Sequence, residues 1–270
     1  MSDAAGAASQ GFPLIRPAGG DTAQPRNLSK RLRFLAAHGV VPGRRVLDGG
    51  CGGGEYVVAL RAAGVLAFGV EFLAEKVREQ PAGVPTGTIL RADLEHLPYG
   101  PSSFDVVFLN EVLEHVPDER RALREVWRVL RPAGTVIILS PNRLFPFETH
   151  GVHLRRSGRR VPPYVPFVPY LPLPLGRRFL RYWARNYWAG ELARLVRSIG
   201  YETRSTGFLW QTFENISGQQ PYALTLLRPV LRMVAEICER LPLVRRFGVS
   251  QAVVAEKVVP HGQTFDAAAS

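Results

Sequence analysis

The chain has 270 residues, of which 46% are hydrophobic and 21% charged, and a formal net charge of +11 at pH 7. This length fits one large α/β domain with insertions or two small domains, and the absence of an apolar run of about 18 residues excludes a transmembrane helix of ordinary length. The start of the chain lacks the segments of a signal peptide, and Cys51 and Cys238 are the only cysteines. We therefore expect a cytoplasmic protein with reduced thiols.

The predicted elements of the first half alternate between helix and strand. They are a helix over 27–37, a strand over 45–48, a helix over 56–63, a strand over 65–70, a short helix through 79, strands over 88–92 and 104–109, a helix over 117–130 and a strand over 135–139. This order is typical of an α/β fold with a parallel sheet. Residues 1–26 are rich in Ala, Gly, Ser and Pro, and we expect them to be disordered.

The regular pattern breaks at Ser140. Residues 141–188 are rich in proline, aromatic residues and arginine, and a helix over 190–199 and a strand from Tyr201 follow. Residues 209–249 form a second irregular segment, with an apolar helical stretch over about 224–241 that Pro229 interrupts. A last strand is predicted over 251–259, before a disordered tail at 260–270.

Charge is distributed unevenly between the two halves. Residues 51–150 hold 10 basic and 13 acidic side chains, whereas residues 151–250 hold 16 arginines and 5 glutamates. The basic character of the chain therefore belongs to its C-terminal half.

A glycine-rich loop follows the first strand, with Gly50, Gly52 and Gly54 at alternate positions. Glycine permits positive φ and close approach of the backbone to a ligand. Glu71 stands at the end of the second strand, where an acid suits the two hydroxyls of a ribose. The loop and the acid together indicate an adenosine-containing ligand, but Glu55 stands where a dinucleotide-binding loop has a small residue, which weakens an NAD interpretation.

These residues resemble the class I S-adenosylmethionine-dependent methyltransferases, in the branch that includes the ubiquinone and menaquinone biosynthesis enzymes. The resemblance rests on the segments 46–54, 92–98, 103–107, 110–116 and 128–134. It departs from the family at Gly49, where a larger apolar residue is usual, and at Ala133, where glycine is usual. The resemblance implies a Rossmann-like, doubly wound, seven-stranded sheet whose last strand is antiparallel. The methyltransferase domain would span 27–259, with insertions 141–188 and 209–249 after strands 5 and 6.

The resemblance also implies the cofactor and the residues that bind it. S-adenosyl-L-methionine would place its methionine part against Gly50, Gly52 and Gly54, with Asp48 ordering its ammonium group and Asn110 lying nearby. Glu71 would bind the ribose hydroxyls. Asp93 would accept a hydrogen bond from the adenine amine, with Leu94 beside the ring.

Three residues are candidates for the chemistry. A base is needed only if the acceptor loses a proton, and histidine titrates near neutral pH. His150, with Glu148 two positions before it, follows the fifth strand, and His115 follows the fourth, at the edge where doubly wound sheets bind ligands. An exposed loop histidine and a structural histidine at a helix entry are the alternatives. The histidines and cysteines show no zinc spacing, so no metal site is predicted.

The two insertions have three possible roles. Arg177, Arg178, Arg181 and Arg185 fall near one face at helical spacing, so this segment could be a lid over the substrate or lie on an anionic membrane surface as a peripheral contact. Nucleic acid is disfavoured, because the acidic run 110–114 replaces the Asn/Asp-Pro-Pro-Tyr/Phe motif of enzymes that methylate base amines and would repel a phosphate backbone.

The sequence therefore predicts a methyltransferase acting on a small-molecule or lipid-like, hydrophobic acceptor. A cofactor-binding or membrane-surface scaffold without catalysis is the alternative from another class, and an NAD-linked oxidoreductase is a third. The sequence leaves open the acceptor, the methylated atom and the oligomeric state.

Overall fold

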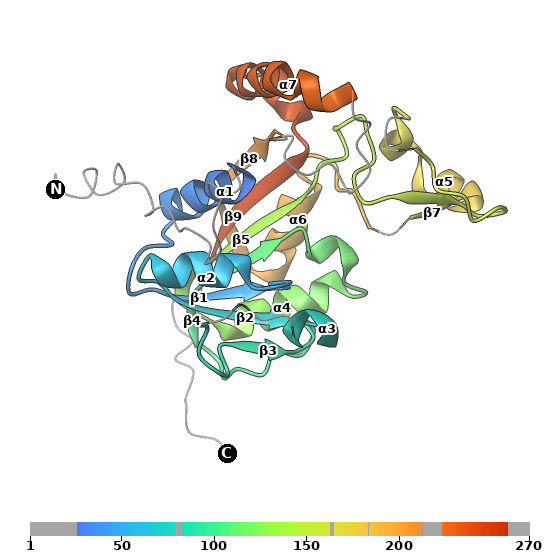
Figure 1. The fold of residues 1–270 in the computed structure, drawn as a ribbon. Helices are drawn as coiled ribbons and strands as arrows, with labels where there is room; N and C mark the ends of the chain where they lie inside the picture. Colours follow the sequence, from blue (N-terminus) through green and yellow to red (C-terminus); the bar gives the residue numbers. More distant parts are fainter. Residues whose placement is uncertain are drawn as a thin grey trace.

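A twisted sheet of seven strands, in the order β3-β2-β1-β4-β5-β9-β8, forms the centre of the molecule (Figure 1). The computed structural model describes residues 26–78, 81, 83–162, 165–182, 184–210, 212 and 223–258. The strands are β1 (Arg45–Gly49), β2 (Leu66–Glu71), β3 (Ile89–Arg91), β4 (Phe104–Asn110), β5 (Leu130–Pro141), β8 (Tyr201–Leu209) and β9 (Ser250–Lys257). The first five are parallel to their neighbours, and β9 runs antiparallel to both β5 and β8. The predicted fold class and the antiparallel last strand are confirmed.

Helices cover both faces of this sheet. On one face, α1 (Arg26–Ala37) and α2 (Glu55–Ala62) pack over a core that includes Leu35, Leu60 and Phe108. On the other face lie α4 (Glu119–Val129) and α6 (Glu191–Ile199). The short helix α3 (Ala74–Arg78) lies between β2 and β3, and η2 (Leu113–His115) connects β4 to α4. The helices α1, α2, α4 and α6 each bury apolar residues spaced three or four apart, so a doubly wound sheet follows from the alternating pattern.

The two departures from the family pattern have local explanations. A Cβ on Gly49 would lie 2.6 Å from the Leu109 Cδ2 atom and 2.9 Å from the Leu94 Cδ2 atom, so both leucines fill the space of a larger residue. Ala133 has φ +58°, in the left-handed region that favours glycine. The turn is therefore kept with an alanine in a strained backbone conformation.

The first insertion folds into a small unit of its own. It contains β6 (Val152–Leu154), η3 (Val168–Tyr170), α5 (Leu173–Phe179) and β7 (Leu180–Tyr182). β6 and β7 pair antiparallel, and Val152, Val168 and Leu180 bury their side chains together. The helix predicted to carry Arg177 to Arg185 on one face is therefore wrong beyond Phe179. Pairing with β6 and burial of Leu180 override the helical spacing of the arginines.

The second insertion contains α7 (Ala223–Arg240) and η4 (Val244–Phe247) before β9. Pro229 lies inside α7 without ending it, so the predicted interruption is wrong. The loss of one backbone hydrogen bond in the second turn is tolerated there. Apart from Arg26, the tails predicted to be disordered lie outside the described residues.

Among the described helices, none combines the length and the apolar composition that crossing a membrane would require.

Candidate active site

The site lies at the carboxyl edge of the sheet, where several strands end together. Gly49 pairs with Leu109, and Asn110 at the end of β4 pairs with Leu139 of β5. Since β9 runs antiparallel, its first residue, Ser250, lies opposite the last residue of β5. Side chains from the first, fourth, fifth and last strands therefore meet at one edge, as the doubly wound topology requires.

The glycine-rich loop adopts backbone conformations that only glycine accepts without strain. Gly50, Gly52 and Gly54 have φ of +75°, +55° and +89°. A Cβ on Gly50 would lie 2.5 Å from the side chain of Val112, whereas a Cβ on Gly52 would meet nothing within 4 Å. The loop therefore packs closely at Gly50 and leaves open space above Gly52.

A cleft of about 460 Å³ adjoins this loop and is lined by four of the eight predicted cofactor residues, whereas Asp48, Gly52, Gly54 and Asn110 do not line it. Its lining includes Gly50, Glu71, Asp93, Leu94, Glu111, Val112 and His115. Glu71 accepts hydrogen bonds from the backbone N–H groups of Gly52 and Leu73, each at 2.9 Å. Each carboxylate oxygen has further lone pairs, so this acid can still accept from two ribose hydroxyls. The position of Glu71 therefore fits the role that the resemblance implies.

The buried carboxyl group of Asp48 shows whether a ligand with a positive charge would fit beside the glycine-rich loop. Its side chain is 1% exposed, and its Oδ2 atom has no hydrogen-bond partner among the described residues. Burial first, and then the charges of Glu55 and Glu71, raise the pKa of Asp48 to about 8. A buried carboxyl without a partner is costly, and an ammonium group would satisfy it. The residues present therefore fit S-adenosylmethionine, whose methionine part carries such a group.

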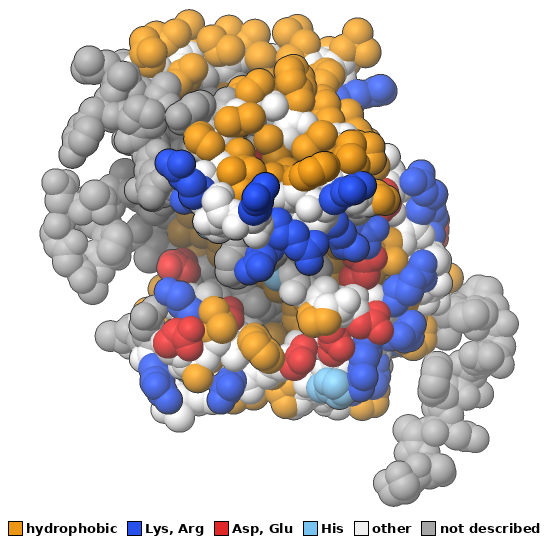
Figure 2. All heavy atoms as spheres, turned by 90° about the vertical axis from the view of Figure 1, so that its right-hand side faces the viewer, with side chains coloured by type: hydrophobic (Ala, Val, Ile, Leu, Met, Phe, Trp, Pro, Cys, Tyr) orange, Lys and Arg blue, Asp and Glu red, His pale blue; other side chains and the backbone are white. Residues whose placement is uncertain are grey.

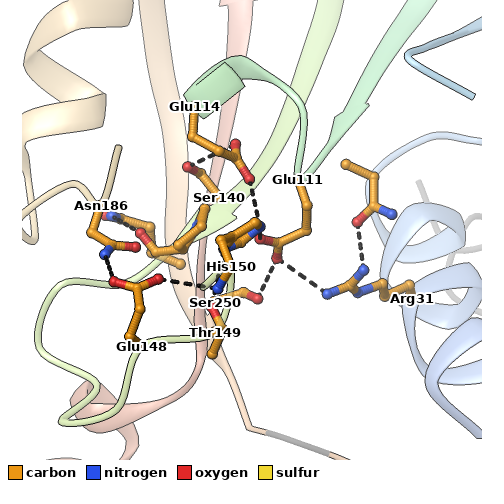
Figure 3. Close-up of polar contacts among 12 residues, drawn as sticks. Arg31, Glu111, Glu114, Ser140, Glu148, Thr149, His150, Asn186 and Ser250 are labelled. Atoms are coloured by element: carbon orange, nitrogen blue, oxygen red, sulfur yellow. Dashed lines mark hydrogen bonds and ion pairs between the residues drawn. The ribbon is translucent and has the colours of Figure 1, made fainter. Parts of the chain in front are cut away.

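Arg31 of α1 is a site residue that the sequence analysis missed. Its guanidinium donates to the Asn110 Oδ1 atom at 2.7 Å and to the Glu111 Oε1 atom at 3.2 Å (Figure 3). The oxygen of Asn110 is therefore engaged by Arg31, and Asn110 itself does not line the cleft. Nothing in the local sequence marks Arg31, because α1 reaches the strand edge only through the tertiary fold.

Glu111 holds a strained position at the end of β4. Its φ is +56°, in the left-handed region, and its carboxylate accepts from Arg31 and from the hydroxyl of Ser250. Strain of this kind persists only where the surroundings determine it, and it is frequent at functional sites. Here the contacts with Arg31 of α1 and Ser250 of β9 hold Glu111 in this conformation.

His150 lies between two acidic side chains, at the centre of the group drawn in Figure 3. Its Nε2 atom is 3.5 Å from the Glu114 Oε1 atom and 4.0 Å from the Glu111 Oε2 atom, and its ring is 5.1 Å from that of His115. Burial lowers the pKa of His150, the charge of Glu111 raises it, and His115 lowers it. Burial and the charge of Glu111 raise the pKa of Glu114 well above its ordinary value. At neutral pH the imidazole is therefore neutral and able to accept a proton.

Glu148 contacts the backbone of His150 rather than its ring. The Glu148 Oε1 atom accepts from the His150 N–H at 3.0 Å, and the Oε2 atom accepts from the Asn186 side chain at 2.9 Å. The His150 Nδ1 atom lies 3.1 Å from the hydroxyl of Thr149. Glu148 is thus placed to hold the loop that carries His150.

The same corner brings together three side chains that could hold a cation. The ligand atoms of Glu114, His115 and His150 all lie within 4.8 Å of one another, and the Glu114 Oε1 atom has no hydrogen-bond partner among the described residues. The sequence predicted no metal set, because His150 comes from the loop after β5 while the other two residues belong to η2. This arrangement can accept a proton or bind a divalent cation.

A second, basic cleft of about 650 Å³ lies between the start of α4 and the first insertion. It shares Val116 and Pro117 with the first cleft, and Glu114 also lines it. Arg155, Arg177 and Arg181 enter it from the insertion. His150 lines neither cleft, but it contacts Glu114 of the basic cleft and His115 of the first one.

Comparisons with known proteins agree with this geometry. Residues 47–138 match the family model described as a methyltransferase domain. The ubiquinone biosynthesis O-methyltransferase of Methylococcus capsulatus is 36% identical over 120 residues, which are 42% of this chain and 50% of that protein. The chain thus spans about half the length of the curated relatives it matches.

Solved structures share the fold at low sequence identity. An S-adenosylmethionine-dependent methyltransferase from Mesorhizobium loti has a TM-score of 0.53 at 20% identity, covering 83% of this chain and 95% of that one. A [4+2]-cyclase has a TM-score of 0.52 at 20% identity, covering 91% and 87%. Residues 47–138 therefore match a methyltransferase domain, and the chain shares the fold of solved S-adenosylmethionine-dependent methyltransferases, which implies S-adenosylmethionine as the cofactor.

Proposed function

We propose that the chain transfers a methyl group from S-adenosylmethionine to a hydroxyl of a small, hydrophobic acceptor that also carries an anionic group. The observation that carries this proposal is the position of His150, which is half-buried and lies between Glu111 and Glu114 beside the cofactor cleft. A proton acceptor is needed when a hydroxyl is the nucleophile, because its proton must leave as the new bond forms.

The proposed roles follow from the contacts at the sheet edge. When bound, the cofactor supplies an electrophilic methyl group on a sulfonium. Asp48, Glu71 and the glycine loop would fix its position, and orientation of this kind can contribute about 7–11 kcal/mol. His150 would take the acceptor's proton at Nε2 while the oxygen–carbon bond forms and the sulfur–carbon bond breaks. The charge of Glu111, which raises the pKa of His150, would stabilise the resulting imidazolium.

Glu148 would act as a positioning residue. Both of its carboxylate oxygens are engaged, one by the backbone of His150 and the other by Asn186. Its loss would let the histidine loop move without removing the proton acceptor.

The basic cleft is the proposed acceptor site, and the first insertion would act as its lid. Apolar side chains of Leu113, Val116 and Leu180 line it together with the arginines. Among the described residues, no acidic side chain pairs with Arg177 or Arg181, so both are available to an anionic group. Several relatives are named as ubiquinone biosynthesis O-methyltransferases, which supports a hydroxyl-bearing acceptor with an apolar body.

The test is methyl transfer from labelled cofactor in a cell extract, followed by isolation of the labelled product. We expect His150→Ala to lower turnover by about 100-fold or more, in the range of general base catalysis, with cofactor affinity unchanged. His153→Ala is the matched control, because it removes a histidine from the neighbouring strand β6 and should leave turnover intact.

Two results would contradict the role of His150. Unchanged turnover in His150→Ala would remove it from the mechanism. Turnover that is lost on chelation and restored by Mg²⁺ would assign Glu114, His115 and His150 to a divalent cation instead of a proton.

A cofactor-binding protein without methyl transfer is the second candidate. One observation favours it: a [4+2]-cyclase shares the fold, so the fold alone does not determine the reaction. Tight binding of S-adenosylmethionine with no labelled product from any extract fraction would support this candidate.

A further inference from the structure

The helix α7 exposes the face that a helix of this composition ordinarily buries. Leu227, Val230, Val234, Ile237 and Leu241 recur every three or four residues and are each between 45% and 52% exposed. The polar contacts of this segment point toward the rest of the chain, as in the 2.6 Å ion pair between Lys30 and Glu239. An amphipathic helix normally turns its apolar stripe to the core, whereas α7 buries Ala235 and leaves this stripe about half exposed. We call this stripe, together with Met233, the α7 surface.

Further apolar side chains are exposed after α7 and in the first insertion. Leu243 and Phe247 follow α7 and are 74% and 44% exposed, and Phe167, Leu175 and Phe179 of the first insertion are 51–60% exposed. Apolar side chains gather over the upper half of the view in Figure 2, with a row of Lys and Arg side chains directly below them. An exposed apolar area bordered by charge marks an interaction site.

The exposed arginines beside these apolar side chains indicate the kind of partner that the surface would bind. Arg240, Arg245 and Arg246 are exposed beside the end of α7, and Arg177 and Arg178 are exposed beside Phe179. Arginine at the border of an apolar face suits lipid phosphates, which lie at the level where the apolar residues enter the acyl region. A symmetric contact between two copies of this chain would bring the same patch, with its basic border, against itself. The charges therefore favour an anionic bilayer over a second copy.

We infer that the α7 surface, with η4 and the exposed apolar side chains of the first insertion, docks the protein on an anionic lipid bilayer. Docking of this kind requires neither cofactor nor turnover, so the inference goes beyond the proposed function. It has a consequence for that function, because Arg177 both lines the basic cleft and flanks the docking surface. An amphipathic acceptor could then enter the cleft from the headgroup layer.

Flotation of the full chain with phosphatidylcholine vesicles, with and without about 30 mol% phosphatidylglycerol, tests the inference. We expect binding to the anionic vesicles only, and weaker binding at about 500 mM than at about 50 mM salt, because screening shortens the range of the arginine charges. The double variant Val230→Glu, Ile237→Glu should lower binding by more than tenfold. Replacing Arg245 and Arg246 by Gln should lower it roughly fivefold per residue.

The matched control places the same charge change on the opposite part of the molecule. Val41 and Leu66 are 41% and 46% exposed on the domain that holds the cofactor cleft, and Val41→Glu, Leu66→Glu should float as the unmodified chain does. Circular dichroism and cofactor affinity should match among all variants, since every substituted side chain is exposed.

Three outcomes would overturn the inference. The unmodified chain could fail to float with anionic vesicles while binding S-adenosylmethionine, which would leave the cofactor site intact. The α7 variant could float as well as the unmodified chain. A dimer in solution that the α7 substitutions dissociate, without vesicle binding, would assign the surface to a second copy of the chain.

Discussion

The half of the molecule that forms the cofactor cleft differs from the two insertions in charge, burial and regularity. Residues 51–150 carry more acidic than basic side chains, whereas residues 151–250 hold 16 arginines and 5 glutamates. The first region buries the apolar faces of its helices against the sheet, but α7 and α5 leave apolar side chains in solvent. The first region thus offers a fixed backbone loop and acidic side chains at one edge of the sheet, whereas the second leaves apolar and basic side chains exposed.

The largest expected effect is a loss of cofactor affinity from a substitution in the first region. Glu71→Ala should weaken S-adenosylmethionine binding by about 2–4 kcal/mol, because hydrogen bonds to a charged acceptor are lost and Gly52 also loses its partner. Calorimetric titration measures this affinity, and Glu75→Ala on the exposed side of α3 is the control. Equal affinities in the two variants would show that Glu71 does not contact the cofactor.

The next effect concerns the insertion alone. Replacing Arg177 and Arg181 by Gln should raise the KM for the acceptor roughly tenfold, since two hydrogen-bonded charges to an anionic group are lost. Cofactor affinity should not change, because neither arginine lines the first cleft. Steady-state kinetics with the purified acceptor measure the change. A loss of cofactor affinity in this variant would contradict the proposal that the first region binds the cofactor and the insertion binds the acceptor.

A smaller effect is the release of a proton on cofactor binding. The pKa of Asp48 is about 8, so the side chain is protonated at pH 6.5 in the free protein, and pairing with an ammonium group would ionise it. We expect about one proton released per bound S-adenosylmethionine, measured by calorimetry in buffers of different ionisation enthalpy. 5′-Methylthioadenosine, which lacks the ammonium group, should release none. Release that persists in Asp48→Asn would exclude Asp48 as the source.

The smallest effect is a shift in the pH profile of turnover. Burial lowers the pKa of His150, so activity should fall only as the pH drops below about 6.5, the ordinary value for histidine. Glu111→Gln removes a charge that raises the pKa of His150, and the acid limb should move to lower pH. Glu114 and His115 also face His150, and Arg31 pairs with Glu111. A shift of the acid limb to higher pH would contradict the assignment.

Much of the fold was predictable because its signals are local. The alternating elements, the glycines at 50, 52 and 54 and the antiparallel last strand all follow from the sequence and the family resemblance, and the structure confirms the sheet. Boundaries were less accurate: β5 begins at Leu130 and continues to Pro141, beyond the predicted 135–139 at both ends. The extra pairing with β4 and β9 extends the strand past its apolar core.

The candidate site also contains residues that the sequence predicted and residues that only the structure shows. Gly50, Glu71, Asp93 and Leu94 line one cleft because each follows a parallel strand that ends at the same edge, a relation that strand order alone predicts. Arg31 was missed, since a helix from the start of the chain crosses that edge only after folding. The helix expected around Arg181 was wrong, because β6 supplies a pairing partner that the local spacing does not contain.

The sequence by itself determined the doubly wound sheet and the placing of the glycine loop, Glu71 and Asp93 at one edge of it, because hydrophobic periodicity and glycine chemistry act over a few residues. Only the tertiary structure decided that His150 lies between Glu111 and Glu114 and that α7 turns its apolar stripe outward. Both depend on contacts between segments far apart in the chain. The spacing of α7 is the same whether its apolar face is buried or exposed, and the packing of the remaining chain selects one of the two.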